Sequence, residues 1–465
     1  MSGQRRDGSG GSDGFGDSDG SDRRTGVVVD TLTEAFSALM TASPLAFRAK
    51  FRTMARDPFA FYRGTACLFY TDLGAGGLFA GLDDDWVDDE GSRVWIQGDL
   101  HAENFGTYMD AQGRLVFDVN DFDEAYLGHW TWDPLRFCAS LAVLCWQKAL
   151  PDAVIDQLVE AYLRSYLDQI EHYRSVDVDT GWALTLHTAS GAVLDALHTA
   201  KLSTRVDLLS RSTVVEDHAR RFTAAPGVRR LEDAEREEVV EAFGRYLETI
   251  PAHQRDVGVT YDVLDVVGRS GFGIGSAGLP AYNVLIEGFT QALDNDVVLT
   301  VKQGNVAAPS RVVDDPRVRD FFEHHGHRTA VSQRALQAHA DRFLGWTDLT
   351  GASGERTGFV VSEYSPYEAD LEWSDVADPD QMLELVQQLG RATAKIHCVA
   401  DDESDHGLVT VSVEEVVSRC VGGRADEFVE QVRAFAHAYA EQVRVDHALF
   451  VDAFRSGAFV EVAPA

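Results

Sequence analysis

The sequence predicts an α+β protein with two lobes, a large helical lobe and a small lobe built on an antiparallel sheet. Apolar residues recur every three or four positions over much of the chain, which is typical of amphipathic helices. Between residues 261 and 303 the apolar period changes to two, which indicates successive strands. The chain has 465 residues, more than one compact core of ordinary size accommodates, so we expect more than one structural unit.

The N-terminal part is expected to begin in a disordered tail and to continue in helices. Residues 1–26 are rich in Gly, Ser and Asp and offer almost nothing to bury, which also argues against a secretory signal. Residues 31–72 have helical spacing. An acidic loop at 83–90 leads to a strand at 93–97, and a further strand is expected at 114–119.

The remaining elements follow the same two periods. Residues 132–250 are expected to be helical throughout. After them we expect three strands, a helix, a strand and three more helices, at 261–267, 281–287, 297–303, 329–343, 358–363, 382–397 and, for the last two helices, 411–454. The expected units are a tail (1–26), a large helical lobe (27–254), a small β-rich lobe (255–365) and a helical segment that completes the large lobe (366–465).

The chain is strongly acidic and poor in lysine. Its 75 acidic and 41 basic residues give a formal charge of −34, and only five of the basic residues are lysines. Such a surface stays hydrated when salt screens its charges, so we expect a salt-adapted cytoplasmic protein from a halophile. The alternative, a surface for a basic partner, predicts one local patch, whereas acidic residues recur along the chain. No basic stripe is present to bind nucleic acid, and no apolar run is long enough to span a membrane.

Two acidic loops follow predicted strands and are candidates for phosphate chemistry. Residues 98–104 read GDLHAEN, and phosphoryl transfer needs a carboxylate near the acceptor hydroxyl and a neutral oxygen ligand for Mg²⁺ a few positions on. Asp99 and Asn104 suit these two roles. Residues 120–124 read NDFDE, and the carboxylates of Asp121 and Asp123 can complete the metal site.

A glycine-rich segment and an isolated lysine are candidates for nucleotide binding. Glycines allow backbone N–H groups to approach phosphate oxygens without interference from side chains. The segment 268–278 lies between two predicted strands, which excludes a Rossmann motif, and its candidate residues are Gly271, Gly273, Gly275, Ser276 and Gly278. Lys302 ends the third strand, and pairing with nucleotide phosphates would explain a lysine at this largely apolar place.

Together these motifs resemble the protein-kinase-like superfamily, especially its aminoglycoside and choline phosphotransferase branch. The resemblance implies that Asp99 is the catalytic aspartate, Asn104 a metal ligand and Asp121 the main magnesium carboxylate. It implies ATP and Mg²⁺ as cofactors and a small-molecule or protein acceptor. From about residue 30 onward, the chain also resembles the uncharacterised prokaryotic family "domain of unknown function 2252", which implies no function.

The order of the motifs differs from that of kinases, because the glycine segment follows Asn104 by 164 positions (268 minus 104) instead of preceding it. A circularly permuted kinase-like fold would reconcile the order. In support, residues 389–397 resemble the helix that normally leads into the catalytic loop. The hinge between the lobes would lie at 362–365, which places Glu363 among the nucleotide-binding residues.

The helix expected at 329–343 contains no glutamate to pair with Lys302. The candidates that could replace it are Glu323, Gln333 and Gln337. The partner of Lys302 is therefore left open by the sequence.

Several alternatives remain open at the level of sequence. The same residues could serve a nucleotide-binding pseudokinase with a regulatory role, or an enzyme that transfers the nucleotidyl group of ATP. A metallophosphoesterase is disfavoured, because its Asp-x-His and Gly-Asn-His motifs are absent and His101 is expected to be structural. The histidines of 323–327 favour a solvated turn over a metal site. The acidic loop 83–90 could attract a cationic acceptor, although a solvated loop is the simpler interpretation.

Overall fold

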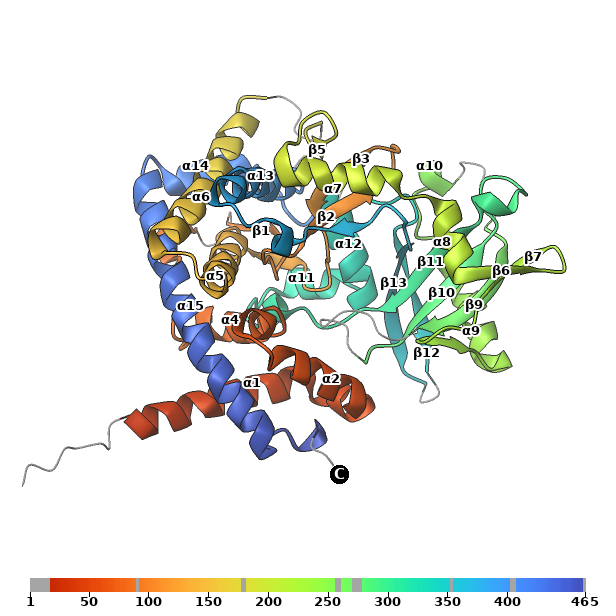
Figure 1. Cartoon of the computed structure of the whole chain (residues 1–465), viewed down its shortest axis with the longest axis horizontal. Helices are drawn as coiled ribbons and strands as arrows, with labels where there is room; N and C mark the ends of the chain where they lie inside the picture. Colours follow the sequence, from red (N-terminus) through yellow and green to blue (C-terminus); the bar gives the residue numbers. More distant parts are fainter. Residues whose placement is uncertain are drawn as a thin grey trace, which may run out of the picture.

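The computed structural model describes residues 17–88, 92–176, 181–255, 261–269, 278–351, 354–401 and 407–462. Over these residues the chain is a mixed α+β protein, and every strand pairing is antiparallel. Figure 1 shows most of the helices gathered on one side of the molecule and the largest sheet on the other. No helix of the described part is long and apolar enough to cross a bilayer.

Four helices open the chain: α1 (Asp17–Ala42), α2 (Pro44–Met54), α3 (Pro58–Arg63) and α4 (Ala66–Leu73). Residues 17–26, expected as tail, are therefore helical, and residues 1–16 lie outside the described ranges. Arg24 attaches this part of the helix to the rest of the protein, because it donates to Asp72 at 2.6 and 2.8 Å and to Asp446 at 2.8 Å. Both carboxylates are buried, so this arginine anchors an otherwise polar segment to the protein body.

Short strands surround the two acidic loops. The first pair consists of β1 (Arg93–Ile96) and β4 (Tyr126–His129), and the 3₁₀ turn η1 (Asp84–Trp86) precedes it. A second sheet has the order β14-β2-β3-β5, with β14 (Ala369–Asp370), β2 (Phe105–Met109), β3 (Leu115–Val119) and β5 (Leu184–Thr185). The loop 97–104 leaves β1 and enters β2, and 120–125 leaves β3 and enters β4. The start of each loop therefore lies beside the end of the other, because Ile96 pairs with Tyr126 and Phe105 pairs with Val119.

The helical body is built from distant parts of the chain. Its helices are α5 (Trp132–Gln147), α6 (Asp152–Tyr173), α7 (Gly191–Leu202), α13 (Pro379–Cys398), α14 (Val413–Val421) and α15 (Ala425–Ser456), whereas α8 (Arg205–Ser212) lies with the large sheet described below. Here α13 packs on α6, and α15 packs on α5. The α13–α6 contact is close at Gly390, where a Cβ atom would lie 2.3 Å from the carbonyl oxygen of Tyr162.

The prediction that residues 132–250 are helical throughout is wrong, because strands interrupt them. Besides β5, these strands are the hairpin β6 (Thr213–Glu216) and β7 (Ala219–Phe222), followed by β8 (Val228–Arg230). The turn of the hairpin is formed by Asp217 and His218, both at positive φ. Residues 214–216 are all exposed, so neither face of this strand is buried along its length and its sequence lacks the alternation of apolar and polar residues that predicts a strand.

A six-stranded sheet forms the other side of the molecule, in the order β12-β13-β11-β10-β9-β8. The strands of this sheet besides β8 are β9 (Val263–Arg269), β10 (Ala281–Ile286), β11 (Val297–Gln303), β12 (Gly345–Thr350) and β13 (Arg356–Glu363). The remaining elements of the chain are α9 (Asp233–Leu247), α10 (Ala252–Arg255), η2 (Leu293–Asn295), η3 (Ala308–Arg311), α11 (Pro316–Phe321), α12 (His325–Gln337), η4 (Trp373–Asp375) and η5 (Val460–Val462). The three strands expected between 261 and 303 are confirmed as β9, β10 and β11. One face of the sheet shares a core with α9.

Candidate active site

The first acidic loop begins with a glycine that no other residue could replace without strain. Gly98 has φ +82, and a Cβ atom at this position would lie 2.2 Å from the carbonyl oxygen of Glu124. Glycine is therefore required by both the left-handed backbone and the close approach of the second acidic loop. The turn directs the next residue, Asp99, away from the strand and toward a pocket.

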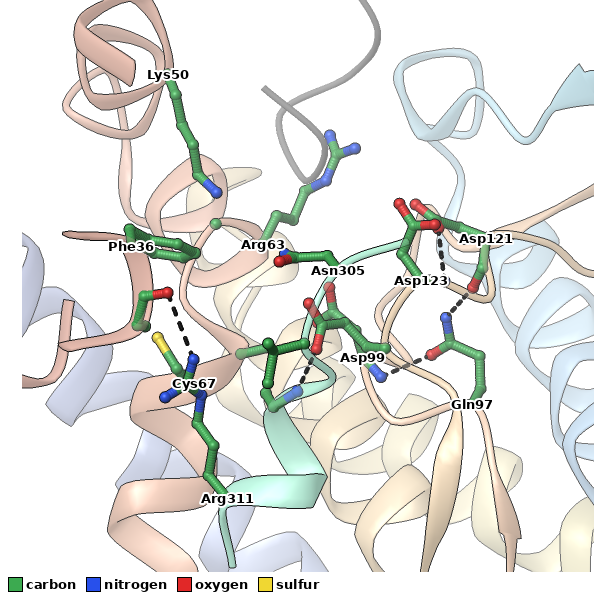
Figure 2. A pocket seen from close by; sticks show the side chains of 16 residues that line it. Phe36, Lys50, Arg63, Cys67, Gln97, Asp99, Asp121, Asp123, Asn305 and Arg311 are labelled. Carbon is green, nitrogen blue, oxygen red and sulfur yellow. Dashed lines mark hydrogen bonds between the residues drawn. The ribbon is translucent and has the colours of Figure 1, made fainter. Parts of the chain in front are cut away.

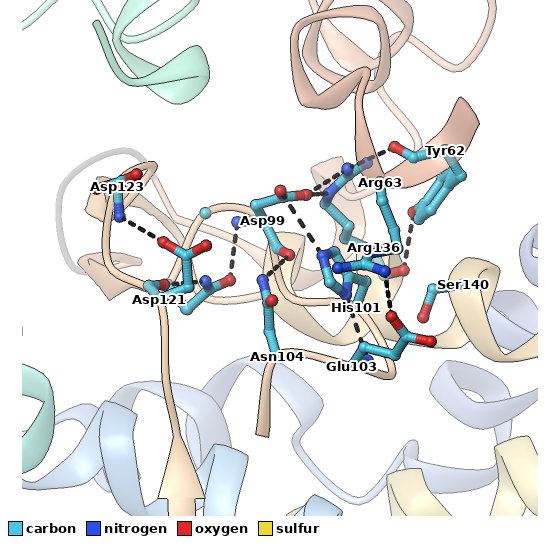
Figure 3. A network of polar contacts seen from close by, with 12 residues as sticks. Tyr62, Arg63, Asp99, His101, Glu103, Asn104, Asp121, Asp123, Arg136 and Ser140 are labelled. Carbon is cyan, nitrogen blue, oxygen red and sulfur yellow. Dashed lines mark hydrogen bonds and ion pairs between the residues drawn. The ribbon is translucent and has the colours of Figure 1, made fainter. Parts of the chain in front are cut away.

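The carboxylate of Asp99 is held by one arginine and is otherwise open to the pocket. Nε of Arg136 donates to Oδ1 of Asp99 at 2.6 Å, and Nη2 contacts the same oxygen. Burial raises the pKa of Asp99, and Arg136 offsets part of this effect. The second oxygen, Oδ2, lies 4.0 Å from Nε2 of His101 (Figure 3). Asp99 thus has one oxygen fixed and one available to a ligand.

Asn104 and Gln97 fix the two loops to each other. Nδ2 of Asn104 donates to the carbonyl oxygen of Asp99 at 2.9 Å, which leaves its Oδ1 as the free ligand atom of the amide. Nε2 of Gln97 donates to the carbonyl oxygen of Asp121 at 2.5 Å, while its Oε1 accepts the backbone N–H of Asp99 at 2.9 Å. The backbone N–H of Asn120 donates to the carbonyl oxygen of Asn104 at 3.1 Å. The two loops therefore form one unit.

Asp121 has the properties of an unsaturated metal ligand. It adopts φ +56, a left-handed conformation that aspartate tolerates better than most residues. Burial, and then the nearby charge of Asp123, raise the pKa of Asp121 to about 6. Its carboxylate accepts the backbone N–H of Asp123 at 3.3 Å. Asp121 retains an exposed surface and forms no ion pair with another described residue, so its carboxylate, beside that of Asp123, is accessible to a ligand, and a divalent metal would stabilise two such neighbouring carboxylates.

Lys302 meets the second acidic loop. Its Nζ atom donates to Oδ2 of Asp123 at 2.5 Å, although the two residues are 179 positions apart. Burial lowers the pKa of Lys302, but Asp123 and then Asp121 outweigh this effect and leave the pKa raised. The ammonium group is therefore a fixed cation beside two carboxylates.

The candidates for replacing the missing glutamate have other contacts. Gln333 donates to Gln337 at 3.1 Å, and Gln337 donates to the carbonyl oxygen of Val119 at 3.4 Å. The backbone N–H of Glu323 donates to His327 at 3.1 Å. The structure assigns the role of ion-pair partner of Lys302 to Asp123, a residue that the sequence pointed to only as a metal ligand.

Arg328 is a residue of the site that sequence reasoning missed. It lies in α12, is 2% exposed, and donates to the carbonyl oxygens of Asp123 at 2.6 Å and Asn305 at 3.0 Å. It also donates to the carbonyl oxygen of Ala125. The helix next to the lysine strand thus holds the second acidic loop through this arginine. The sequence feature that could have revealed Arg328 is an arginine within a helix whose other residues are mostly buried.

Helix α13 supports the first acidic loop from behind. Nε2 of His397 lies 3.2 Å from the carboxylate of Asp133, which in turn accepts the backbone N–H groups of Gln97 at 2.7 Å and Gly98 at 2.9 Å. The same helix contacts β1, the strand that leads to Asp99. It therefore fixes the direction in which the loop leaves the strand.

A second contact from α13 anchors the strand that leads to Asp121. Nζ of Lys395 donates to Oδ2 of Asp118 at 2.5 Å, and both side chains are almost fully buried. The same ammonium group contacts the last carbonyl oxygens of α12, at Leu336 (3.4 Å) and Gln337 (3.3 Å). A lysine at this position complements the partial negative charge at the end of a helix.

The pocket next to Asp99 has a second wall that the sequence did not predict (Figure 2). This wall comes from the N-terminal helices and from η3, and its basic members are Lys50, Arg63 and Arg311. Glu124 lies on the opposite side, where burial raises its pKa to about 7. The cavity has a volume of about 40 Å³, room for about three water molecules.

The structure therefore unites five of the predicted site residues: Asp99, Asn104, Asp121, Asp123 and Lys302. Four of the predicted nucleotide-binding residues, Gly271, Gly273, Gly275 and Ser276, lie outside the described ranges. Gly278 has φ +85, and a Cβ atom there would lie 2.9 Å from Cβ of Ser43, at the start of α2.

Glu363 lies apart from the acidic loops. Its carboxylate pairs with Arg205, and its backbone N–H donates to Asp341 at 2.7 Å. The pKa of Glu363 rises to about 7, because burial and Asp341 outweigh the effect of Arg205. Its side chain thus forms local contacts near the end of β13.

The histidines have structural roles. Nδ1 of His101 accepts the backbone N–H of Glu103 at 3.3 Å, and burial lowers the pKa of His101 well below its usual value. Nδ1 of His324 accepts the backbone N–H of His327 at 2.9 Å and caps α12. Within the described ranges, no three His, Cys, Asp or Glu side chains converge to hold a metal ion.

The described residues of the acidic loop, 83–88, are not among those that line the pocket. The carboxylate of Asp83 pairs with His129 at 2.8 Å and accepts the hydroxyl of Thr131 at 2.6 Å. The carboxylate of Asp88 pairs with Arg419 at 2.6 Å. The charges of this loop are thus used for local contacts on the far side of β1 and β4.

The fold and the site together define an α+β protein in which Lys302, on the six-stranded sheet, contacts the second of two acidic loops. These loops are supported by the helical body. The comparison with protein families places it more specifically. Residues 43–453 match the family described as "Uncharacterized protein conserved in bacteria (DUF2252)", and the chain belongs to this family. No curated protein and no solved structure matches the chain significantly.

Proposed function

We propose that this protein is an ATP- and Mg²⁺-dependent phosphotransferase with a circularly permuted protein-kinase-like fold. The observation that supports it best is the position of Lys302, 2.5 Å from Asp123 in the loop that also presents Asp121. Nothing in the local sequence requires a lysine at residue 302 to meet a carboxylate at residue 123. A site for a polyphosphate and its metal accounts for a fixed cation beside two neighbouring carboxylates.

The order of elements in the sheet supports the same assignment. In protein kinases a glycine-rich loop covers the phosphates, the lysine lies on the third strand, and a helix follows it. Here the sheet contains β9, β10 and β11 as neighbours, Lys302 lies on β11, and α12 precedes β12 and β13. Helix α13, near the end of the chain, supports the loop of Asp99, as a permuted order requires.

The residues present fit Mg²⁺ and the phosphates of ATP. Asp121 lacks a cation of its own, Asn104 retains a free amide oxygen, and Lys302 has donors left after its bond to Asp123. These residues would hold the metal and the phosphates, since Mg²⁺ favours one or two carboxylates together with phosphate oxygens. When bound, the nucleotide supplies the transferred phosphoryl group and the metal neutralises its charge.

Asp99 would orient the acceptor and receive its proton. Arg136 fixes one carboxylate oxygen, and the other is directed to the pocket, within reach of an acceptor hydroxyl. Burial raises the pKa of Asp99, which makes it a stronger base than an exposed aspartate. The acceptor, a small molecule or a protein, would enter between the loop of Asp99 and the N-terminal helices.

The test is calorimetric titration of ATP onto the protein in molar KCl, with Mg²⁺ and with a chelator, followed by ³¹P NMR of a reaction with metabolite pools. We expect binding that requires Mg²⁺, and ADP as the released nucleotide. Equal ATP binding in chelator would contradict the proposed site. Release of pyrophosphate would assign nucleotidyl transfer instead, and binding without any turnover would assign a pseudokinase.

A further inference from the structure

Lys50 is a buried cation without an opposite charge of its own. It lies in α2, is 4% exposed, and points into the pocket of Asp99 (Figure 2). Its Nζ atom lies 4.0 Å from the centre of the Phe36 ring, and no described residue gives it a hydrogen bond or an ion pair. In a chain with five lysines, burying one of them against an aromatic ring costs free energy that some ligand or function must offset.

Two arginines extend this basic wall. Nε of Arg63 is buried and has no hydrogen-bond partner among the described residues, although the other end of its guanidinium pairs with Glu103. Arg311 contacts the protein through the carbonyl oxygen of Ala35 at 3.4 Å and has no ion pair within the described part. Three cations therefore line one wall in a protein whose net charge is −34.

The carboxylates across the pocket do not explain this wall. Asp99 is paired with Arg136, and Asp123 is paired with Lys302. Asp121, which also lines the pocket, is assigned to the metal in the proposed function. Glu124 accepts the backbone N–H of Ala308, and no ion pair joins it to Lys50 within the described residues. The three basic groups are therefore available to bind an anionic ligand.

We infer that the acceptor is a small hydroxylated molecule with a carboxylate or phosphate group, which Lys50 and Arg63 bind while its hydroxyl faces Asp99. This inference rests on the proposed function and names the substrate class for the same site. The closed space of about 40 Å³ admits one such anionic group, and the rest of the acceptor extends along the loop of Asp99. A cationic acceptor would face three like charges, which disfavours it.

Anion binding can be tested independently of turnover by NMR of the lysine side chains. With only five lysines, selective labelling gives few signals, and the signal of Lys50 is identified by its loss in Lys50→Met. The probe is inorganic phosphate, added with and without Mg²⁺ and a non-hydrolysable ATP analogue that fills the nucleotide site. We expect a saturable shift of the Lys50 signal while the exposed Lys201 stays unchanged. A Lys50 signal that moves no more than that of Lys201 overturns the inference.

Acceptor specificity provides the second test. The panel contains hydroxylated compounds in matched sets: neutral, amine-bearing, carboxylate-bearing and phosphate-bearing. For the preferred anionic acceptor, Lys50→Met should raise KM at least tenfold and leave KM for ATP within twofold, while Lys50→Arg retains binding and Lys201→Met has no effect. Preference for a neutral or cationic acceptor, with Lys50→Met unchanged, overturns the inference and leaves the phosphotransferase intact. If ATP is never consumed, the proposed function fails and the phosphate titration alone decides the anion site.

Discussion

The Nζ atom of Lys302 lies 2.5 Å from Oδ2 of Asp123, and this contact joins the six-stranded sheet to the acidic loops. Both side chains are largely buried, with 21% and 15% of their surfaces exposed. A buried ion pair adds little to stability by itself, but the loss of one partner is costly because the other charge stays buried. Variants of this pair therefore allow its effect on stability to be measured separately from its effect on ligand binding.

Lys302→Met should lower the free energy of unfolding by about 3 kcal/mol, since Asp123 loses its counter-charge. It should also weaken Mg²⁺-dependent ATP binding at least tenfold. The double variant Lys302→Met/Asp123→Asn should recover much of the stability but not the ATP affinity. Urea unfolding and calorimetry measure the two effects, and Lys201→Met is the control. A double variant that binds ATP like the wild type would remove Lys302 from the nucleotide site.

Asp99→Asn should reduce phosphoryl transfer by about 10²- to 10⁴-fold, because the amide cannot accept the acceptor proton. ATP affinity should stay within a few-fold, since Asp99 faces the pocket on the acceptor side. Single-turnover assays and ATP titrations check the two parts. Asp152→Asn, at an exposed aspartate, serves as the control. Turnover within tenfold of wild type would exclude Asp99 as the base.

Asp121→Asn should abolish the dependence of ATP binding on Mg²⁺, because it removes the carboxylate that forms no ion pair with another described residue. At the same time the apo protein should become more stable, as one of two neighbouring like charges disappears. Thermal unfolding without metal, and ATP titrations with and without Mg²⁺, give the two readouts. An unchanged response to Mg²⁺ would place the metal elsewhere.

Lys395→Met should destabilise the protein by about 3–5 kcal/mol, because Asp118 would be left buried and unpaired. Lys395→Met/Asp118→Leu should be more stable than Lys395→Met alone, as no isolated charge remains. Urea unfolding of the wild type and the three variants, including Asp118→Leu, gives the interaction energy. If the single and double variants lose the same stability, the pair does not anchor β3 to α13.

Glu363 gives the stability a specific dependence on pH. Burial raises its pKa to about 7 in the folded protein, against 4.5 as the ordinary value. The folded state thus binds this proton more tightly than the unfolded chain does. Its stabilising contribution is complete below pH 4.5 and is lost as the pH rises through 7.

Glu363→Gln removes this titration, so its stability relative to the wild type should increase by up to about 3 kcal/mol between pH 4.5 and 8. Urea unfolding at both pH values measures the change. Glu235→Gln is the control, because Arg229 lowers the pKa of Glu235, so its contribution is lost only as the pH falls below 4.5 and little change is expected between pH 4.5 and 8. A difference between Glu363→Gln and wild type that does not grow with pH would contradict the assignment.

The sequence predicted the parts of the site that follow directly after strands. Asp99, Asn104 and Asp121 are recognisable because a polar loop after an apolar strand has a local pattern, and Lys302 because lysine is rare in this chain. The sheet was predictable in its central strands, β9 to β11, since these are buried on both faces or alternate regularly.

The residues that sequence reasoning missed act through tertiary contacts. Lys50 and Arg63 belong to amphipathic helices, where nothing local separates a pocket residue from a surface residue. Arg328 acts on the site by donating to backbone carbonyls of distant loops, which no spacing reveals. The β6–β7 hairpin was missed because Asp217 and His218 form its turn, without the Asn-Gly or Asp-Gly signal of tight hairpins.

The order of the chain also determines when the site can exist during synthesis. Asp118 and Asp133 leave the ribosome early, but their buried partners Lys395 and His397 follow 277 and 264 positions later. At roughly 5–20 residues per second, this delay amounts to about 15–55 s. Until then the loops of Asp99 and Asp121 have no α13 behind them, even though the strand of Lys302 is synthesised earlier. The support that α13 gives to both acidic loops is therefore completed only when translation is nearly complete.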